Sequence, residues 1–260
     1  MSQIDNQREY HDRFYADGSR SHIGTSDPLI DYITNWRIAE AMRRIASASE
    51  GRLDKSTPIL AMCSGDGGEG SVLCDLGYTD VTVSDISGMA VKAAVERDSR
   101  LKGLVLDAQR VDLADGQFGV VLVQDGLHHL PSPIQGFTEM LRLATVGAVF
   151  LEPHDSLVGS LIGTKWERNG DAINYVFRWS HKLVESVASS YLGPDAFRNA
   201  SFSFWHHNPV YARIGRLLGG GAFAFKAIRS IKAALDFCAA PAGNQFCGLV
   251  LRSQPKGEKA

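Results

Sequence analysis

The stretch PILAMCSGDGGEGS, residues 58–71, decides the fold. It begins with a short apolar run, Ile59 to Met62, and ends in a loop that holds four glycines within six residues. Glycine is used where the backbone takes a positive φ or comes very close to another group. A buried strand that breaks into such a loop and then opens a helix is how nucleotide-binding α/β folds begin. We therefore expect the rest of the chain to be arranged around this turn.

The alternation of apolar strand and helix continues up to residue 155. Four further strands are predicted by the apolar runs at residues 81–84, 104–106, 118–123 and 148–151. Helices are predicted to begin near Ser71, Ser87 and Ser132. Uninterrupted apolar strands are typical of a parallel sheet that is buried on both faces. The sequence therefore predicts an α/β fold with a Rossmann-like sheet.

Before this core, the sequence predicts two helices. One covers residues 3–15, with Tyr10 and Phe14 on one face. The second begins with Asp27 as N-cap and Pro28 at the first helical position, and it ends near Gly51.

After the core, the pattern of residues 156–200 is largely helical and predicts an insertion over the strand ends. A sixth strand is predicted at 200–205, and a helical stretch separates it from a seventh at 245–252. We expect these last two strands to form a hairpin that closes the sheet.

Composition excludes several classes of protein. The chain has 260 residues, of which 44% are hydrophobic and 22% charged, as in ordinary globular proteins. A net charge of −2 argues against a dedicated nucleic-acid binder. No apolar run reaches the roughly 18 residues that a membrane span requires. The four cysteines lack CxxC spacing, which predicts reduced thiols and a cytoplasmic protein. The sequence contains no pair of candidate ligands with a local spacing such as HxxxH, so it does not predict a metal site.

Acidic residues follow successive predicted strands. Asp85 lies twenty residues beyond Gly65, Asp107 ends the third strand, and Asp125 follows the fourth. In an open α/β sheet the ligand lies outside the carboxyl ends of the strands. A carboxylate after the second strand can accept both hydroxyls of a ribose. Asp107 and the backbone of Ala108 are placed to contact an adenine.

The stretches PILAMCSGDGGEGS, VTVSDIS, LVLDAQ and FGVVLVQDGLHHL together resemble class I S-adenosylmethionine-dependent methyltransferases, over residues 58–153. The resemblance implies seven strands, mostly parallel with the last antiparallel, and S-adenosylmethionine as cofactor. The cofactor-binding residues that it implies are Gly65, Asp66, Gly67, Glu69, Asp85, Ile86, Asp107, Ala108, Gln124 and Asp125. The sequence departs from the family pattern at Cys63, where an acid is usual, and at Glu69, where a third glycine is usual.

A nicotinamide or flavin enzyme is the rival within the same fold class. A dinucleotide places its pyrophosphate at the first helix N-terminus. Asp66 and Glu69 would repel a pyrophosphate there, whereas a cofactor with a sulfonium and an ammonium group meets no such conflict. The charge of the loop therefore favours S-adenosylmethionine.

Four parts of the chain follow from this interpretation. They are an N-terminal helical lid (1–50), a cofactor-binding core (51–155), a helical insertion with the acceptor pocket (156–200), and the C-terminal part of the sheet (201–255). In the lid, aromatic residues including Tyr15 are expected to cover the cofactor, because excluding water strengthens electrostatic interactions in the site.

The expected reaction is methylation of a small molecule, with a hydroxyl oxygen of a sugar or secondary metabolite as the preferred acceptor. Removal of the hydroxyl proton requires a base, and histidine titrates near neutral pH. The candidate bases are His128, His129 and His154, although one of the adjacent pair is also expected to pack structurally. Transfer to nitrogen or carbon, or a non-catalytic protein that kept the fold, are the alternatives. A homodimer is left open.

Overall fold

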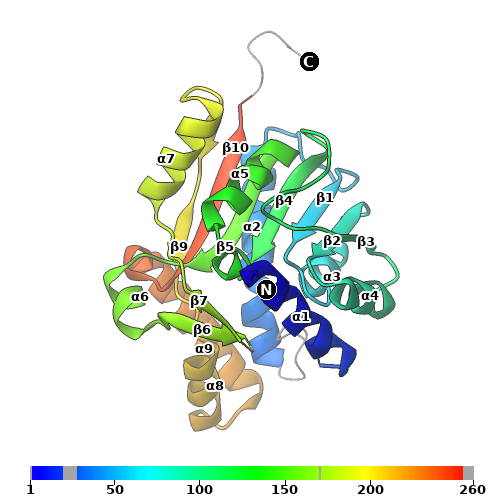
Figure 1. Ribbon diagram of the computed structural model, residues 1–260. Helices are drawn as coiled ribbons and strands as arrows, with labels where there is room; N and C mark the ends of the chain where they lie inside the picture. The colour runs from blue at the N-terminus through cyan, green and yellow to red at the C-terminus, as the bar shows by residue number, and fades with distance from the viewer. Residues whose placement is uncertain (1, 20–27, 170, 254–260) are drawn as a thin grey trace.

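The structure is a computed structural model that describes residues 2–19, 28–169 and 171–253. A central β-sheet carries helices on both faces (Figure 1). Its strands are β1 (Ile59–Met62), β2 (Val81–Asp85), β3 (Lys102–Val105), β4 (Phe118–Gln124), β5 (Ala144–Pro153), β8 (Phe197–Asn199), β9 (Phe202–Phe204) and β10 (Gln245–Arg252). The order is β3-β2-β1-β4-β5-β10-β8, and β9 also pairs with β10.

The first five strands are parallel, and β10 runs antiparallel to β5. This confirms the predicted mostly parallel sheet. The chain winds outward from β1 through β2 to β3 and then crosses to the other side of β1, so that β1 lies between β2 and β4. The carboxyl ends of the parallel strands therefore meet along one edge, where the site lies.

The edge of the sheet differs from the prediction of a single strand at 200–205. It is divided into β8 and β9, which pair with consecutive parts of β10. The interruption is polar, since the Ser201 hydroxyl donates to the Asn199 side chain and accepts from the Leu249 backbone N–H. A side chain thus replaces one step of the ladder, as in a bulge.

Alternate residues of each strand pack on opposite faces. Ile59 and Ala61 belong to the core under α2 (Pro28–Ala48) and α3 (Gly68–Asp75). Leu60 and Met62 belong to the core under α5 (Pro133–Leu143) and α7 (His181–Leu192). Each face buries its side chains completely, which explains why the strands lack the alternation of a half-exposed sheet.

The middle of the insertion was predicted wrongly as helix. A short α6 (Leu157–Ile162) is followed by a β-hairpin of β6 (Trp166–Asn169) and β7 (Ala172–Tyr175), and only then by α7. Asn169 at the end of β6 pairs with Ala172 at the start of β7, so the connection is two residues long, which is the commonest length for a hairpin. The hairpin brings Glu167 to the sheet edge.

Helix α1 (Gln3–Ala16) confirms the predicted first helix and spans between two distant parts of the chain. The Asp12 carboxylate accepts from the Ser87 hydroxyl at 2.6 Å, in front of α4 (Gly88–Arg97). At its other end, Gln3 donates to the Asn174 side chain of β7 at 2.8 Å. Helix α2 includes Pro28 as predicted, and its predicted N-cap Asp27 lies outside the described residues.

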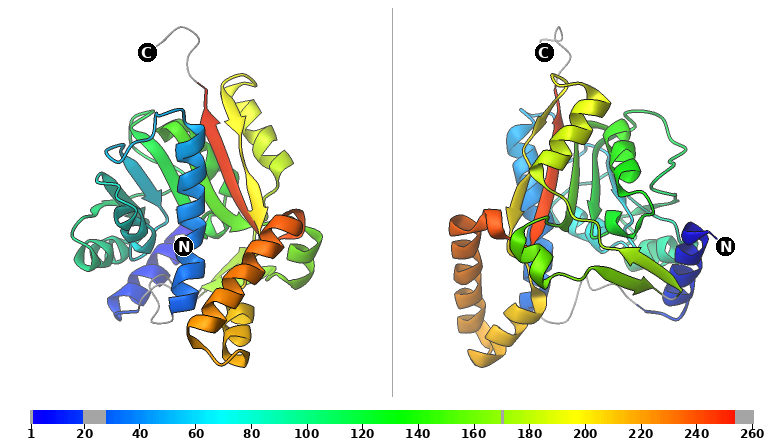
Figure 2. Two further views of the ribbon diagram at one scale, coloured as in Figure 1. Left: turned by 180° about the vertical axis from the view of Figure 1, so that it is seen from behind. Right: turned by 60° about the vertical axis from the view of Figure 1, so that its left-hand side comes forward.

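Helices α8 (Asn208–Leu217) and α9 (Gly221–Cys238) form an antiparallel pair between β9 and β10. Both views of Figure 2 show this pair projecting beyond the rest of the molecule. It packs on the N-terminal part of α2 through Ile33, Tyr211 and Ile228. Among the helices of the described residues, none combines the length and hydropathy that crossing a membrane would require.

Candidate cofactor and acceptor site

A cleft of about 630 Å³ lies along the carboxyl ends of the parallel strands. Helix α1 covers one side of it, the loops after β1 to β4 form its floor, and Glu167 of the hairpin closes another side. Of the predicted site residues, those that line it are Tyr15, Gly65, Glu69, Asp85, Ile86, Asp107, Ala108, Gln124, Asp125, His128 and His129.

The loop after β1 is joined to β2 by Asp85. The Gly65 backbone N–H donates to one carboxylate oxygen at 2.9 Å, and the Ser87 N–H donates to the other at 3.0 Å. Burial raises the pKa of Asp85, and these hydrogen bonds oppose the shift. Gly65 has φ +50°, and a Cβ there would collide with the Tyr15 hydroxyl. The position therefore favours glycine, and α1 lies in close contact with the loop.

Asp66 and Gly67 are not in the cleft, contrary to prediction. Asp66 is fully buried and forms an ion pair with Arg97 of α4 at 2.9 Å. A Cβ on Gly67 would lie 2.7 Å from the Cβ of Ala94. Since the loop reverses after Gly65, these two residues face α4 and fix the helices to each other. The charge that was expected to repel a pyrophosphate is neutralised at Asp66 by the ion pair with Arg97.

Glu69 lies in the first turn of α3, and its side chain faces the cleft. It is nearly fully buried, and the Ser64 hydroxyl donates to it at 3.1 Å. Burial raises the pKa of Glu69 to about 8. A buried carboxyl of this kind is a ready partner for a cation, because an ammonium group would favour its ionised form.

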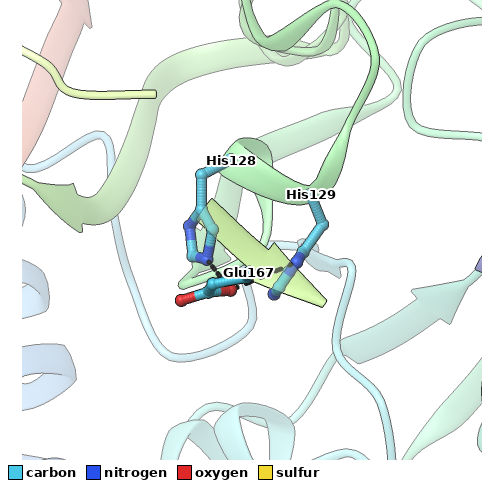
Figure 3. Close-up of side chains that lie close together, drawn as sticks. All are labelled: His128, His129 and Glu167. Atoms are coloured by element: carbon cyan, nitrogen blue, oxygen red, sulfur yellow. Dashed lines mark ion pairs between the residues drawn. The ribbon is translucent and has the colours of Figure 1, made fainter. Parts of the chain in front are cut away.

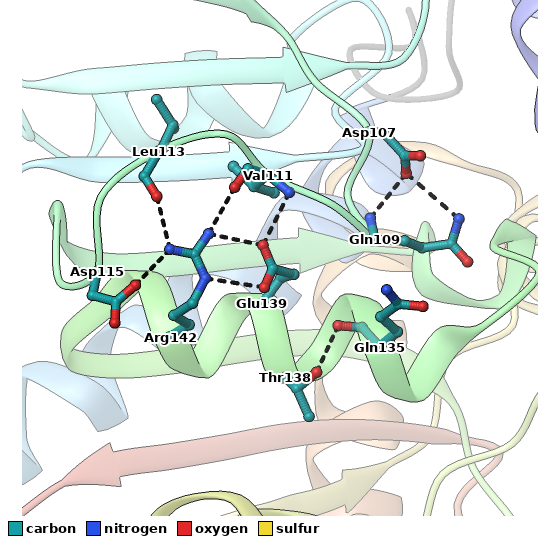
Figure 4. A network of polar contacts seen from close by, with 9 residues as sticks. All are labelled: Asp107, Gln109, Val111, Leu113, Asp115, Gln135, Thr138, Glu139 and Arg142. Atoms are coloured by element: carbon teal, nitrogen blue, oxygen red, sulfur yellow. Dashed lines mark hydrogen bonds and ion pairs between the residues drawn. The ribbon is translucent and has the colours of Figure 1, made fainter.

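The loop after β3 presents Asp107 and Ala108 to the cleft. The Asp107 carboxylate accepts from the Gln109 backbone at 2.9 Å, which folds the loop back on itself. Figure 4 shows how Arg142 of α5 holds the following residues. Its guanidinium donates to the Val111 carbonyl at 2.8 Å and to the Leu113 carbonyl at 2.7 Å. The loop is therefore fixed by the helix behind it.

At the end of β4, Asp125 has φ +50°, which is rare for a residue other than glycine. Its carboxylate forms an ion pair at 2.7 Å with Arg37 of α2, whose side chain is 4% exposed. The Arg37 Nε atom is buried without a hydrogen-bond partner, as is Oε1 of Gln124. Strained backbone and unsatisfied buried polar atoms gather at functional sites, so this corner is set up for a ligand.

His128 and His129 follow in a short 3-10 helix, η1 (Leu127–His129). Behind them, the fully buried Glu152 of β5 accepts from the Gly126 N–H, from the Leu127 N–H, and from His128 Nδ1 at 2.6 Å. Burial alone lowers the pKa of His128, but Glu152 and then Glu167 outweigh it and raise that pKa to about 10. His128 is therefore an imidazolium at neutral pH.

Both imidazole rings point toward the Glu167 carboxylate (Figure 3). His128 Nε2 lies 3.5 Å from Glu167 Oε2, and His129 Nδ1 lies 3.8 Å from the same oxygen. Burial and the positive charge of His128 lower the pKa of His129 to about 3. One ring of the pair is therefore charged and the other neutral. Among the described residues, these three also form a group with the spacing that a metal ion would require.

His154 was predicted to line the pocket, and the structure places it elsewhere. Its Nδ1 lies 2.8 Å from the Gly243 carbonyl, and its ring stacks on Phe246 at 5.4 Å. Residues 152 and 154 would share a face in a continuous strand, but β5 ends at Pro153, and His154 lies beyond it in a bridge to Trp179. Glu152 reaches the back of the cleft, and His154 ties β5 to the segment before β10.

Three residues of the cleft were missed by sequence reasoning. Arg37 stands among apolar residues on the buried face of α2, and a lone charge at i+4 from Ile33 was the available signal. Glu167 could have been found from the hairpin pattern. His206 follows β9 and is half-buried in the cleft wall, where burial lowers its pKa well below the usual value.

Comparison with known families identifies the core. Residues 60–151, which extend from β1 into β5, match the family described as "Methyltransferase domain". This segment is a methyltransferase domain. The chain is an S-adenosylmethionine-dependent methyltransferase, and S-adenosylmethionine is the cofactor of the domain. No curated protein matches the methyltransferase sequence significantly.

Solved structures similar to this methyltransferase extend the likeness to nearly the whole chain. Magnesium protoporphyrin IX methyltransferase from Synechocystis PCC 6803, solved with S-adenosylmethionine, has TM-score 0.56 and 13% identity over 97% of this chain and 98% of that one. The cyclase SpnF has TM-score 0.61 and 13% identity over 98% and 97%. A sarcosine dimethylglycine methyltransferase of Galdieria sulphuraria has TM-score 0.56 and 15% identity over 95% and 98%. At such identities the likeness concerns the fold.

Proposed function

We propose that this methyltransferase methylates a hydroxyl oxygen of a small polar molecule, such as a sugar or a hydroxylated secondary metabolite. The observation that carries the proposal is the Glu152–His128–Glu167–His129 cluster, which faces the same cleft as Asp85 and Asp107. A hydroxyl acceptor loses its proton during transfer, and this cluster offers imidazole and carboxylate groups at the place where the proton must go.

The cofactor residues are assigned by their place along the cleft. We assign Asp85, beside Ile86, to the ribose hydroxyls, and Asp107 with Ala108 to the adenine. Glu69 takes the ammonium group of the cofactor, in place of the acid that Cys63 replaces in the loop. S-adenosylmethionine, when bound, supplies the methyl group on a positively charged sulfur. Asp125 and Gln124 lie between the two halves, at the end of β4.

Proton transfer is assigned to His129. Its ring is neutral at physiological pH, because burial and the charge of His128 lower its pKa to about 3. A pKa this low makes the free ring a weak base, so proton transfer to His129 requires a neighbouring group that stabilises the protonated ring. Glu167, 3.8 Å away, stabilises the charge that appears on the ring. Glu152 holds His128 as an imidazolium, and this fixed cation orients Glu167 from the other side. Positioning of the acceptor supplies the remainder of the rate enhancement.

The unpaired polar atoms that line the cleft favour an acceptor with many hydroxyl groups. Buried polar atoms without a hydrogen-bond partner occur on six cleft residues, namely Gln7, Arg37, Gln124, His206, Asn208 and Gln245. Each such atom costs about 1–3 kcal/mol while it is unpaired. A hydroxyl both donates and accepts, so a sugar can satisfy amide oxygens, amide nitrogens and a guanidinium together. An apolar acceptor would leave these costs in place.

We further propose that α1 acts as a lid. Tyr10, His11, Phe14 and Tyr15 line the cleft from α1, which is held at both ends by the Asp12 and Gln3 hydrogen bonds. Release of these two contacts would open the cleft to solvent and to the cofactor. Closure excludes water and strengthens the electrostatic interactions around the sulfonium.

The experiment follows the methyl group. The protein is incubated with isotope-labelled S-adenosylmethionine and a panel of monosaccharides and phenols, and NMR distinguishes a methyl on oxygen from one on nitrogen. We expect O-methyl product, and a loss of turnover of about 10²–10⁴-fold in His129→Ala. The matched control is His154→Ala, which lies outside the cleft. Product methylated on nitrogen, or full turnover by His129→Ala, would refute the proposal.

A further inference from the structure

The tip of the α8–α9 pair carries large apolar side chains that are exposed. Leu217 is 79% exposed and Phe223 is 72% exposed, on either side of three consecutive glycines with positive φ. Leu218 adds a third exposed apolar side chain between them. The three glycines form the turn between α8 and α9, and this turn lies at the outer end of the helix pair (Figure 2).

Cations surround this tip without any acidic residue. From Asn208 to Leu235 the sequence contains five basic residues and neither Asp nor Glu, although the whole chain has net charge −2. Four of the five are exposed, namely Arg213, Arg216, Lys226 and Arg229. The fifth, Lys232, is buried and paired with Asp236. The exposed cations all lie within three turns of the apolar tip, which is about 16 Å along a helix.

We propose that the tip docks on an anionic phospholipid surface, with Leu217, Leu218 and Phe223 inserted among the headgroups. Interfacial segments place apolar side chains about 5–10 Å into the boundary of the bilayer, with Lys and Arg at the level of the phosphates. The distances along α8 and α9 match that arrangement. Charge complementarity selects anionic lipid, because each Lys or Arg near such a surface contributes to binding.

Two other occupants fit the same residues less well. A second copy of the chain, related by a two-fold axis through the tip, would bring four exposed cations against four others. Nucleic acid would match the cations but would leave Leu217 and Phe223 in water. Docking would also orient the site, since α8 begins at Asn208, which lines the cleft.

The test is co-flotation of the full chain with vesicles of phosphatidylcholine alone or with about one third phosphatidylglycerol. We expect binding to the anionic vesicles only, and its loss when salt is raised from ~0.1 M to ~1 M. The variant Leu217→Glu/Phe223→Glu should lose vesicle binding. Arg213→Gln/Arg216→Gln/Lys226→Gln should lower the partition coefficient roughly a hundredfold, at about fivefold per cation.

Phe237→Glu is the matched control, because Phe237 is 90% exposed at the far end of α9 and should bind vesicles like the wild type. Calorimetry with S-adenosylhomocysteine shows that each variant is folded, and its outcome is independent of vesicle binding. Absence of binding to anionic vesicles at low salt would overturn the proposal, as would equal binding by the tip variant. A dimer that the tip variant abolishes, or DNA binding in place of vesicle binding, would also overturn it.

Discussion

The two halves of the cleft are built in different ways. In the half that we assign to the cofactor, Gly65, Asp85 and Asp107 lie at or just beyond the ends of strands, and the sheet order brings them together. In the acceptor half, Arg37 comes from α2, Glu167 from the hairpin, and His206 from the segment after β9. These elements are joined only by packing of the finished fold.

The difference also appears in the electrostatics. The Asp85 carboxyl is held by backbone N–H groups of its own and the neighbouring loop, as any chain with this sheet would hold it. His128 and Glu167 are held by each other and by Glu152, so that the charge of one residue sets the pKa of the next. A cofactor site of this kind tolerates changes elsewhere, whereas the acceptor site depends on every member of its network.

The largest expected effect is on the pKa of His128 in the Glu152–His128–Glu167–His129 cluster. Glu152→Gln should lower the pKa of His128 from about 10 toward the usual 6.5 or below, a change of about a thousandfold in proton affinity, because the carboxylate that outweighs burial is removed. NMR titration of the histidine rings measures it. The exposed Glu185→Gln on α7 is the control, and an unchanged His128 titration in Glu152→Gln would contradict the network.

The same variant has a signature in stability. The folded-state pKa of His128 lies above its unfolded value, so the stabilisation is fully present below about pH 6.5 and is lost as the pH rises through about 10. The free energy of unfolding of the wild type should fall over that window, and in Glu152→Gln this fall should disappear. Denaturant titrations at several pH values compare the two.

The second effect concerns the cofactor half alone. Asp85→Ala should weaken S-adenosylhomocysteine binding by about a hundredfold, because two hydrogen bonds to a charged group are lost. The titration of His128 should not change, since the two halves are held separately. Calorimetry is the measurement, and Asp80→Ala at the opposite end of β2 is the control. Unchanged affinity in Asp85→Ala would mean that the ribose lies elsewhere.

A smaller effect is expected at Glu69. Its carboxyl, with pKa about 8, is mostly protonated at pH 7, and an ammonium partner requires the ionised form. Binding of S-adenosylhomocysteine therefore releases a proton, and its affinity should rise by up to about tenfold per pH unit from pH 6 toward 8. In Glu69→Gln this rise should vanish. If both proteins show the same pH dependence, the ammonium group has another partner.

The smallest effect is expected at His154. His154→Gln should leave both cofactor affinity and the His128 titration unchanged, and should cost about 1 kcal/mol of stability from the lost contact with the Gly243 carbonyl. Thermal unfolding and calorimetry check the two parts. Loss of cofactor affinity would show that this segment belongs to the cleft after all.

Prediction from sequence succeeded where a residue is placed by its own strand. The parallel strands, the antiparallel β10, and the strand-end residues Asp85 and Asp107 follow from apolar runs and the residues that end them. Prediction failed where the direction of a side chain depends on residues that are distant in the sequence but adjacent in the fold. Asp66 and Gly67 belong to the same loop as Gly65, yet they face α4. There Asp66 forms an ion pair with Arg97, and Gly67 packs closely against Ala94.

The sequence by itself determined the buried strands, the glycine turn and the strand-end positions of Asp85 and Asp107, because each rests on residues near one another along the chain or on apolar runs that mark buried strands. Only the tertiary structure decided that Glu152 and Glu167 enclose His128, that Arg37 meets Asp125, and that His154 turns away. These contacts join residues from 24 to 89 positions apart, and their distances and burial set the charges of the site. No local pattern encodes such values, since they arise from desolvation and Coulomb interactions in the completed fold.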